Sequence, residues 1–248
     1  MKTKKFAVSA IAALMVFVMA FSSFAWAEAE PKSGTQVEAV FFGDDLQLFI
    51  EADGDEEMLD TFWVYYSDGT FEQFAEVEDK FVLFSVGTYE FGENNDFHFE
   101  AGTPDKGIIT IRRNKKYNAA DGLADYESEH TYELGTLGYD RVFVRDENGK
   151  NIKSIFYGND KQPYVEEDGD DEMLDTALFF YSDGTFDQYI EKDDQLKLYG
   201  QGTYEMPDAE DFGKVTISVI QKDSVEPASP ETHDLKALGF DQMVAIAD

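Results

Sequence analysis

The chain has 248 residues, with 52 Asp and Glu against 20 Lys and Arg, a formal charge of −32 and no cysteine. Such a surface repels nucleic-acid phosphates and anionic lipid headgroups, which argues against nucleic acid or a membrane surface as the partner. No disulfide is possible, and an aromatic content of 15% indicates a packed core rather than a disordered chain.

Residues 1–27 have the three-part pattern of a secretory signal peptide: a basic start, an apolar run from Phe6 to Phe21, and the small residues of Ala25-Trp26-Ala27. About 16 apolar residues are fewer than the roughly 20 that span a bilayer, which disfavours the alternative of an uncleaved anchor. We expect cleavage after Ala27 and a secreted bacterial protein with no stable membrane anchor. Removal of three lysines and no acid lowers the formal charge to −35.

The rest of the chain contains one unit twice. Residues 51–90 align with 166–205 without a gap, and 23 of these 40 positions are identical, with similarity continuing on both sides. Copies of about 100 residues have the size of a domain rather than of a solenoid repeat. The sequence therefore predicts an N-terminal tail over 28–35, one repeat over 36–146, a linker over 147–153 and a second repeat over 154–248.

Each repeat reads as antiparallel β-structure. Asp68-Gly69 and Asp183-Gly184 separate runs of aromatic and β-branched residues, which is typical of a tight hairpin. With a two-residue loop, one face would carry Phe62, Val64, Tyr66, Phe71, Gln73 and Ala75, and we expect this face to point inward. The other would carry Trp63, Tyr65, Phe74 and several acids, and we expect it to point outward.

The next strand alternates in the same way, with Phe81, Leu83, Ser85, Gly87 and Tyr89 on one side. Its small residues would let the strand bend. The exception to the β pattern is "DGDEEMLD", where Asp53 precedes Glu56 by three residues as at a helix start; Asp168 and Asp171 repeat the spacing. The expected fold is all-β, with two antiparallel up-and-down barrels or coiled sheets of about eight short strands, and a short helical turn in each.

A strand, a "DGTF" hairpin, an acidic strand and "GTYE" occur together in about 45 residues of each copy. In this arrangement the chain resembles the lipocalin-like (calycin-type) β-barrel domains of exported bacterial proteins. The resemblance implies antiparallel barrels and, as a function, capture of a small apolar ligand inside one or both.

Two glutamines lie at matching places on the expected inward face, Gln73 and Gln188. A buried amide without partners costs about 1 to 3 kcal/mol, so each needs hydrogen bonds from protein, water or ligand. Tyr89 and Tyr204 are their expected neighbours. These four residues are the candidate ligand contacts, and an internal hydrogen-bond network is the alternative.

Acidic residues gather in "EADGDEEMLDT" and "EEDGDDEMLDT". Asp53, Asp55, Asp168 and Asp170 are the candidate calcium ligands, because calcium prefers several oxygens from one compact loop. The EF-hand register is missing, and turn capping plus solvation explains the same residues. The sequence indicates no cofactor apart from this calcium hypothesis.

The expected outward face is aromatic at Trp63, Tyr65 and Phe74, and such a patch is too large to remain bare. Either the other copy covers it, or an extracellular protein or glycan stacks on it. The second alternative gives a second hypothesis, an envelope or extracellular interaction protein assisted by acidic loops and calcium.

Catalysis has little support. His98, His130 and His233 have no metal-ligand spacing, there is no cysteine nucleophile, and no nucleophile-elbow or phosphate-binding loop occurs. The sequence therefore favours a non-enzymatic binding protein.

Overall fold

The computed structural model describes residues 32–92, 107–133, 136–145, 150–165, 170–205, 214–221 and 231–247. The expected signal peptide, His98, Asp168 and residues 147–149 of the expected linker lie outside these ranges. Within them, no helix has the length and apolarity needed to cross a bilayer.

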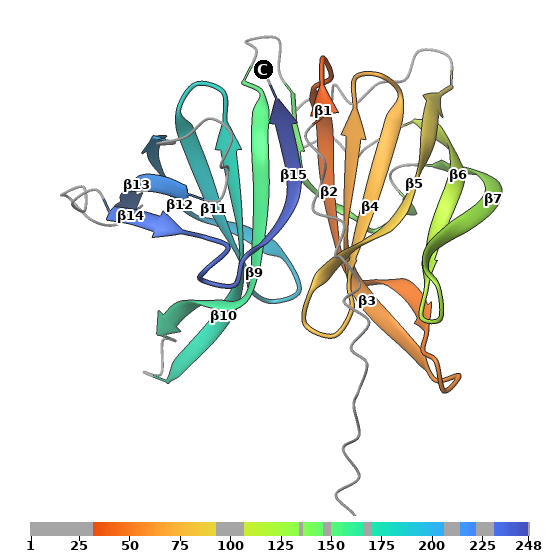
Figure 1. Cartoon of the computed structure of the whole chain (residues 1–248), viewed down its shortest axis with the longest axis horizontal. Coiled ribbons are helices and arrows are strands. Elements are labelled where there is room, and N and C mark those ends of the chain that lie inside the picture. Colours follow the sequence, from red (N-terminus) through yellow and green to blue (C-terminus); the bar gives the residue numbers. More distant parts are fainter. Residues whose placement is uncertain are drawn as a thin grey trace, which may run out of the picture.

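Two coiled sheets stand side by side, one for each repeat (Figure 1). The first has the order β7-β6-β5-β4-β3-β2-β8, so six consecutive strands form a meander and the last strand returns beside the first. Its strands are β2 (Val37–Ile50), β3 (Glu56–Tyr66), β4 (Thr70–Glu76), β5 (Phe81–Phe91), β6 (Ile108–Asn118), β7 (Gly122–Glu133) and β8 (Asp140–Val144).

The second sheet repeats this order and adds one strand from the start of the chain, giving β1-β15-β9-β10-β11-β12-β13-β14. Its own strands are β9 (Ile152–Val165), β10 (Asp171–Tyr181), β11 (Thr185–Glu191), β12 (Leu196–Glu205), β13 (Lys214–Gln221), β14 (Glu231–Asp234) and β15 (Asp241–Ala247). The added strand is β1 (Lys32–Ser33), which pairs in parallel with Ile246 and Ala247 of β15. The all-β prediction is confirmed, in the form of coiled sheets.

The prediction of a helical turn over residues 53–60 is wrong. Residues 51–55 form the corner between β2 and β3, closed by hydrogen bonds from the Gly54 and Glu51 amides, and β3 begins at Glu56. The Asp53 carboxylate accepts a bond from the Asp55 amide at 3.2 Å, so it caps a turn and not a helix. Ile50 on β2 pairs with Glu56 on β3, so the backbone at Glu56 is part of the sheet and cannot form a helix.

The predicted Asp-Gly corner is present, but the two-residue loop is wrong. Tyr65 pairs with Phe71, so Ser67, Asp68 and Gly69 lie between the strands. The Gly69 amide bonds to the Tyr66 carbonyl and Gly69 has φ +81°, as in a type I turn followed by a left-handed residue. The extra residue shifts the register by one, which moves every side chain of β4 to the opposite face from the prediction.

Both faces of this hairpin are buried, each in a different core. Trp63, Tyr65 and Phe71 lie inside the first coiled sheet, with Ile109 and Ile111 of β6 packed against them. The expected inward residues of β3 instead face the second copy, and one cluster contains Phe42, Phe62, Val64, Tyr66 and Phe74 together with Ile155, Tyr157, Ala177, Phe179, Tyr181 and Val244. The second copy therefore covers the face with Phe62, Val64 and Tyr66, whereas of the predicted patch only Phe74 lies in this shared core.

The strand after the hairpin changes sides at a bulge. Gln73 pairs with Ser85 and Phe74 with Leu83, leaving Phe84 as the extra residue. Phe81 and Leu83 consequently pack in the core between the copies, whereas Tyr89 lies with the inner core. The predicted single face over residues 81–91 is wrong for its first two members because a bulge reverses the alternation.

Candidate binding site between the two copies

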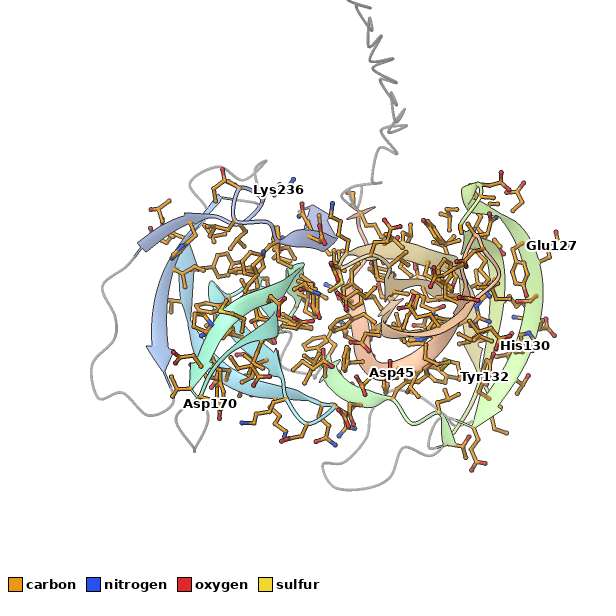
Figure 2. The ribbon with its side chains drawn as sticks, turned by 90° about the horizontal axis from the view of Figure 1, so that it is seen from below. Asp45, Glu127, His130, Tyr132, Asp170 and Lys236 are labelled. Carbon is orange, nitrogen blue, oxygen red and sulfur yellow. The ribbon has the colours of Figure 1, made fainter. Side chains whose placement is uncertain are left out.

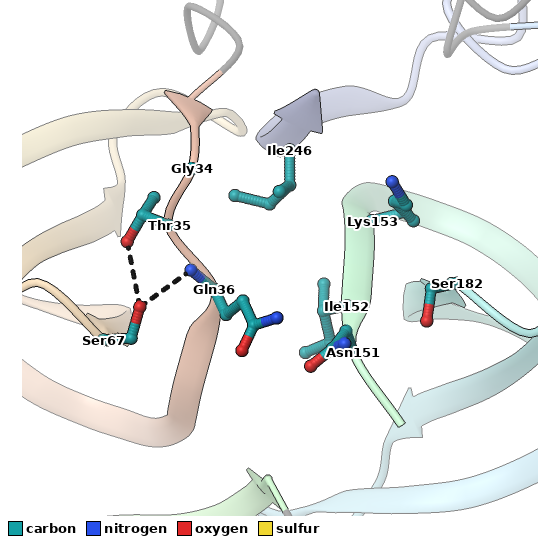
Figure 3. Close-up of a pocket in the computed structure, with 9 residues that line it drawn as sticks. All are labelled: Gly34, Thr35, Gln36, Ser67, Asn151, Ile152, Lys153, Ser182 and Ile246. Atoms are coloured by element: carbon teal, nitrogen blue, oxygen red, sulfur yellow. Dashed lines mark hydrogen bonds between the residues drawn. The ribbon is translucent and has the colours of Figure 1, made fainter. Parts of the chain in front are cut away.

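A cleft of about 510 Å³ lies between the copies, at the end where β2 and β9 begin. Nine residues line it, four from residues 34–67 and five from residues 151–246: Gly34, Thr35, Gln36, Ser67, Asn151, Ile152, Lys153, Ser182 and Ile246 (Figure 3). Gln36 and Asn151 occupy matching positions in the duplication, as do Ser67 and Ser182. The duplication has therefore placed an amide and a hydroxyl on each wall.

The backbone fixes both walls in the same way. The Ser67 amide donates to the Gln36 carbonyl, and the Ser182 amide to the Asn151 carbonyl, each at 2.8 Å. The Ser67 hydroxyl also accepts a bond from the Gln36 amide at 3.0 Å. Ile152 and Ile246 are 1% and 6% exposed, so they give the cleft an apolar floor. Its polar groups are thus held on hydrogen-bonded backbone rather than on free loops.

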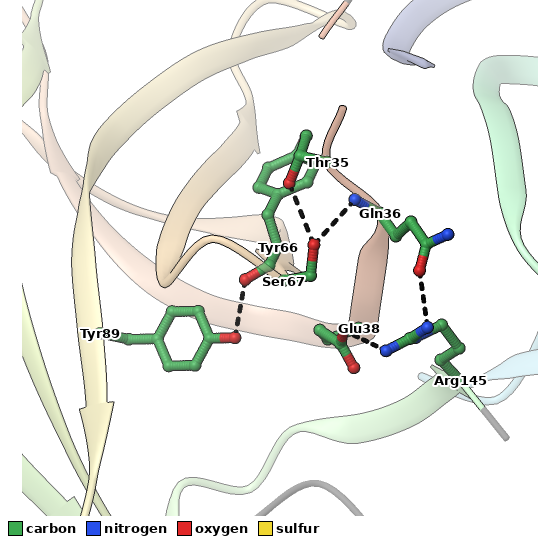
Figure 4. A network of polar contacts seen from close by, with 7 residues as sticks. All are labelled: Thr35, Gln36, Glu38, Tyr66, Ser67, Tyr89 and Arg145. Carbon is green, nitrogen blue, oxygen red and sulfur yellow. Dashed lines mark hydrogen bonds and ion pairs between the residues drawn. The ribbon is translucent and has the colours of Figure 1, made fainter. Parts of the chain in front are cut away.

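The side chain of Gln36 is oriented by a charge pair (Figure 4). Arg145 donates one hydrogen bond to the Glu38 carboxylate and another to the Gln36 Oε1 atom, both at 2.6 Å. A guanidinium can only donate, so the carbonyl end of Gln36 must face Arg145. Its NH2 group then points the other way, into the cleft (Figure 3).

On the facing wall, the side-chain oxygen of Asn151 is buried and has no hydrogen-bond partner among the described residues. A buried acceptor left unpaired costs about 1 to 3 kcal/mol. The cleft is therefore lined on one wall by Gln36, with its oriented NH2 donor, and on the other by Asn151, whose unpaired oxygen is not exposed to solvent.

Near this cleft, a lysine contacts a tyrosine ring and a carboxylate in each copy. The Lys32 ammonium lies 3.5 Å from the centre of the Tyr66 ring and 2.9 Å from a Glu72 oxygen. In the second copy Lys150 lies 3.6 Å from the centre of the Tyr181 ring and 3.7 Å from Asp187. These two lysines do not align in the duplication, yet their ammonium groups contact equivalent partners.

The predicted ligand contacts Gln73 and Gln188 are engaged with protein. Gln73 is fully buried, donates to Gln47 at 2.6 Å and to Thr61 at 3.1 Å, and accepts from Ser85 at 2.8 Å. Gln188 donates to Gln162 at 2.7 Å. Of the two interpretations left open for these amides, an internal network accounts for their geometry.

Tyr89 and Tyr204 are also held by protein. Each hydroxyl donates to the backbone carbonyl just before an Asp-Gly corner, Tyr89 to Tyr66 at 2.8 Å and Tyr204 to Tyr181 at 2.6 Å. Burial raises the pKa of Tyr204 to about 12. The two residues anchor the hairpin corners of their copies.

The residues predicted to form a partner-binding surface are buried. Trp63, Tyr65 and Phe74 are 3%, 3% and 4% exposed. The cause is again the three-residue loop, because its register places Trp63 and Tyr65 in the core of the first sheet and Phe74 in the core between the copies. These three residues cannot stack on a glycan or an extracellular protein without unfolding.

The predicted calcium ligands Asp53, Asp55 and Asp170 do not belong to a converging group of acids, and Asp168 lies outside the described residues. Asp53 and Asp55 are exposed at the corner between β2 and β3, and Asp170 is exposed just before β10 of the second copy (Figure 2). The acids that do converge, among the described residues, are Asp44, Asp60 and Glu191, whose oxygens all lie within 4.8 Å of one another. They lie between the copies, next to an acidic cleft of about 310 Å³ that contains Asp45, Glu76 and Asn159.

Crowded, partly buried acids hold their protons more tightly. Burial, followed by Asp44 and Asp45, raises the pKa of Asp60 to about 6. Burial raises the pKa of Glu76 to about 7, against the lowering effect of a hydrogen bond from Asn159. Burial and then Asp60 and Asp44 raise the pKa of Glu191 further above its ordinary range.

No family profile matches this sequence, and no curated protein and no solved structure is similar enough to count as a match.

Sequence reasoning missed Gln36, Asn151, Asp44 and Glu191. A signal for the first pair was present, because both are polar residues at the same position of the duplication, just before its first strand. For the second pair the alignment shows an acid, Asp44, opposite an amide, Asn159. Neither signal shows that these positions face the other copy.

Proposed function

We propose that this chain is an exported, non-catalytic binding protein that holds a small neutral ligand in the cleft between its two copies. The observation that carries the proposal is the facing pair in that cleft, the Gln36 donor and the unpaired Asn151 acceptor above an apolar floor. A ligand of the amide class, such as a capped dipeptide, matches this pair, because one amide supplies both a carbonyl acceptor and an N–H donor.

Placing the ligand between the copies agrees with the packing better than placing it inside either sheet. The interior of the first sheet holds the rings of Trp63, Tyr65 and Phe71, and the pair Trp63–Phe71 has ring centres 5.2 Å apart. The cleft volume is within the range of small-molecule sites, about 300 to 1,000 Å³.

The test is titration of the ¹⁵N-labelled protein with acetyl-dialanine amide, followed through the side-chain amide signals of Gln36 and Asn151. We expect both signals to move, and Asn151→Ala to weaken binding about tenfold, the equivalent of one well-placed hydrogen bond. Asn118→Ala is the matched control, because Asn118 caps an exposed turn after β6 and lies outside the cleft.

Shifts caused by glucose or maltose at the same two amides, with none from the dipeptide, would contradict the amide class. Binding that survives both Asn151→Ala and Gln36→Ala would place the ligand elsewhere and overturn the proposed site.

A further inference from the structure

At the other end of the interface, the two copies make the same contact with different chemistry. The Nδ2 atom of Asn159, in the second copy, donates to the Glu76 carboxylate of the first copy at 2.6 Å. In the duplication, position 159 corresponds to Asp44 and position 76 to Glu191. The reciprocal contact is therefore Asp44 of the first copy with Glu191 of the second.

The reciprocal contact lacks a donor. An amide brings two N–H donors to a carboxylate, whereas an ionised aspartate brings none. Asp44 and Glu191 nevertheless have oxygens within 4.8 Å of each other and of Asp60. The Oε2 atom of Glu191 is buried and has no hydrogen-bond partner among the described residues. Two carboxylates at this separation cannot both remain charged at low cost, so one proton between them is the simplest way to satisfy the contact.

Further carboxyl groups surround Asp44 and Glu191. Asp60 on β3 and Asp175 on β10 act on Glu191, and Tyr157 on β9 donates its hydroxyl to Asp175. The Asp60 carboxylate accepts the Asp45 amide at 2.9 Å, and Glu76 on β4 is held by Asn159. The next residue along the chain from Glu191 is a cation, Lys192, and its ammonium lies 4.0 Å from the centre of the Tyr164 ring.

We propose that Asp44 and Glu191 form a proton-operated latch between the copies: a shared proton joins them at this end of the interface, and its loss as the pH rises loosens the contact. The shared core of aromatic residues still holds the copies together, so release at the latch frees one end and does not separate them. The proposal does not depend on the ligand of the cleft.

The direction of the effect follows from linkage. Carboxyl groups whose pKa is raised in the folded state bind protons more tightly folded than unfolded, so the free energy of unfolding falls as the pH rises. The fall begins near the ordinary carboxyl pKa of about 4 and ends above the raised values, which are about 6 for Asp60, about 7 for Glu76 and higher for Glu191.

The test exploits the difference between the copies. Asp44→Asn gives the first copy the residue of the second, so its new amide can donate to Glu191 as Asn159 does to Glu76. Urea unfolding at pH 5, 7 and 9 should show the parent losing stability with rising pH and the variant losing less. We expect the ratio of their unfolding equilibrium constants to change by about tenfold or more between pH 5 and pH 9. The part of the pH dependence of stability that arises from Glu76 and Asp60 should remain in the variant.

Asn159→Asp is the reverse variant, since it turns the second contact into another pair of carboxyls. It should fold at pH 5, by circular dichroism, and lose stability with rising pH more steeply than the parent. Hydrogen exchange at pH 9 should be faster in β11 of the parent than in β11 of Asp44→Asn, with β7 equal in both.

Identical pH dependence in the parent and Asp44→Asn would overturn the latch. A parent whose stability at pH 5 falls on adding a chelator, and rises with calcium chloride at every pH, would also overturn it, because a cation and not a proton would then join the two groups.

Discussion

At the scale of single residues, duplication lets each polar group be compared with its counterpart. Gln73 makes three hydrogen bonds and is fully buried, and its partner Ser85 corresponds to Gly200 in the second copy. Gln188 accordingly lacks that acceptor role and is only partly buried. The same glutamine therefore belongs to a complete network in one copy and to a reduced one in the other.

Gln73→Ala should lower the free energy of unfolding by about 2 to 4 kcal/mol, because it creates a cavity and leaves the Ser85 hydroxyl without its acceptor. Gln188→Ala is the matched control and should cost less. Urea denaturation of both variants measures the difference. Equal losses would show that the Ser85 bond contributes nothing measurable.

At the scale of elements, the strands could be predicted from alternation and from the Asp-Gly corners, because both signals are local. The register could not, since Ser67-Asp68-Gly69 and a two-residue loop differ by one residue, and each buries a plausible face. The hairpin is apolar on both sides, so hydrophobic pattern alone does not choose between them. The bulge at Phe84 and the corner at residues 51–55 depend on pairing with neighbouring strands, which no local pattern reports.

Two glycines of this hairpin region should respond differently to alanine. Gly69 has φ +81°, but a Cβ there would lie 3.8 Å from its nearest neighbour, so Gly69→Ala should cost only the backbone term, about 1 to 2 kcal/mol. A Cβ on Gly87 would lie 1.9 Å from the Arg112 carbonyl oxygen, so β5 and β6 would have to separate.

Gly87→Ala should therefore lower the thermal midpoint more than Gly69→Ala, and hydrogen exchange should accelerate in β6. A Gly87→Ala protein as stable as Gly69→Ala would mean that the sheet adjusts at this point at little cost.

At the scale of the whole molecule, the two copies share one core and are not independent. Phe62 and Phe81 of the first copy pack edge-on against Tyr157 of the second, with ring centres 6.0 and 4.3 Å apart. A copy on its own would expose these rings to water. The candidate site could not be predicted from the sequence for the same reason: the cleft and the converging acids Asp44, Asp60 and Glu191 lie where the copies meet.

Residues 32–145 and 150–247, produced as separate chains, should each aggregate or self-associate, and should form a 1:1 complex when refolded together. Native mass spectrometry and size-exclusion chromatography distinguish these outcomes. Phe62→Asp in the first chain should abolish the complex, whereas a charge on the exposed strand β7, Thr131→Asp, should not. Two stable monomers that form no complex when mixed would refute the shared core.

The pairing of Lys32 with Ile246 joins positions separated by almost the whole described chain. Closing so large a loop is entropically costly, and contacts of this kind slow folding. Strand β1 can therefore pair only after β15 has been synthesised, so this edge of the second sheet forms late in folding.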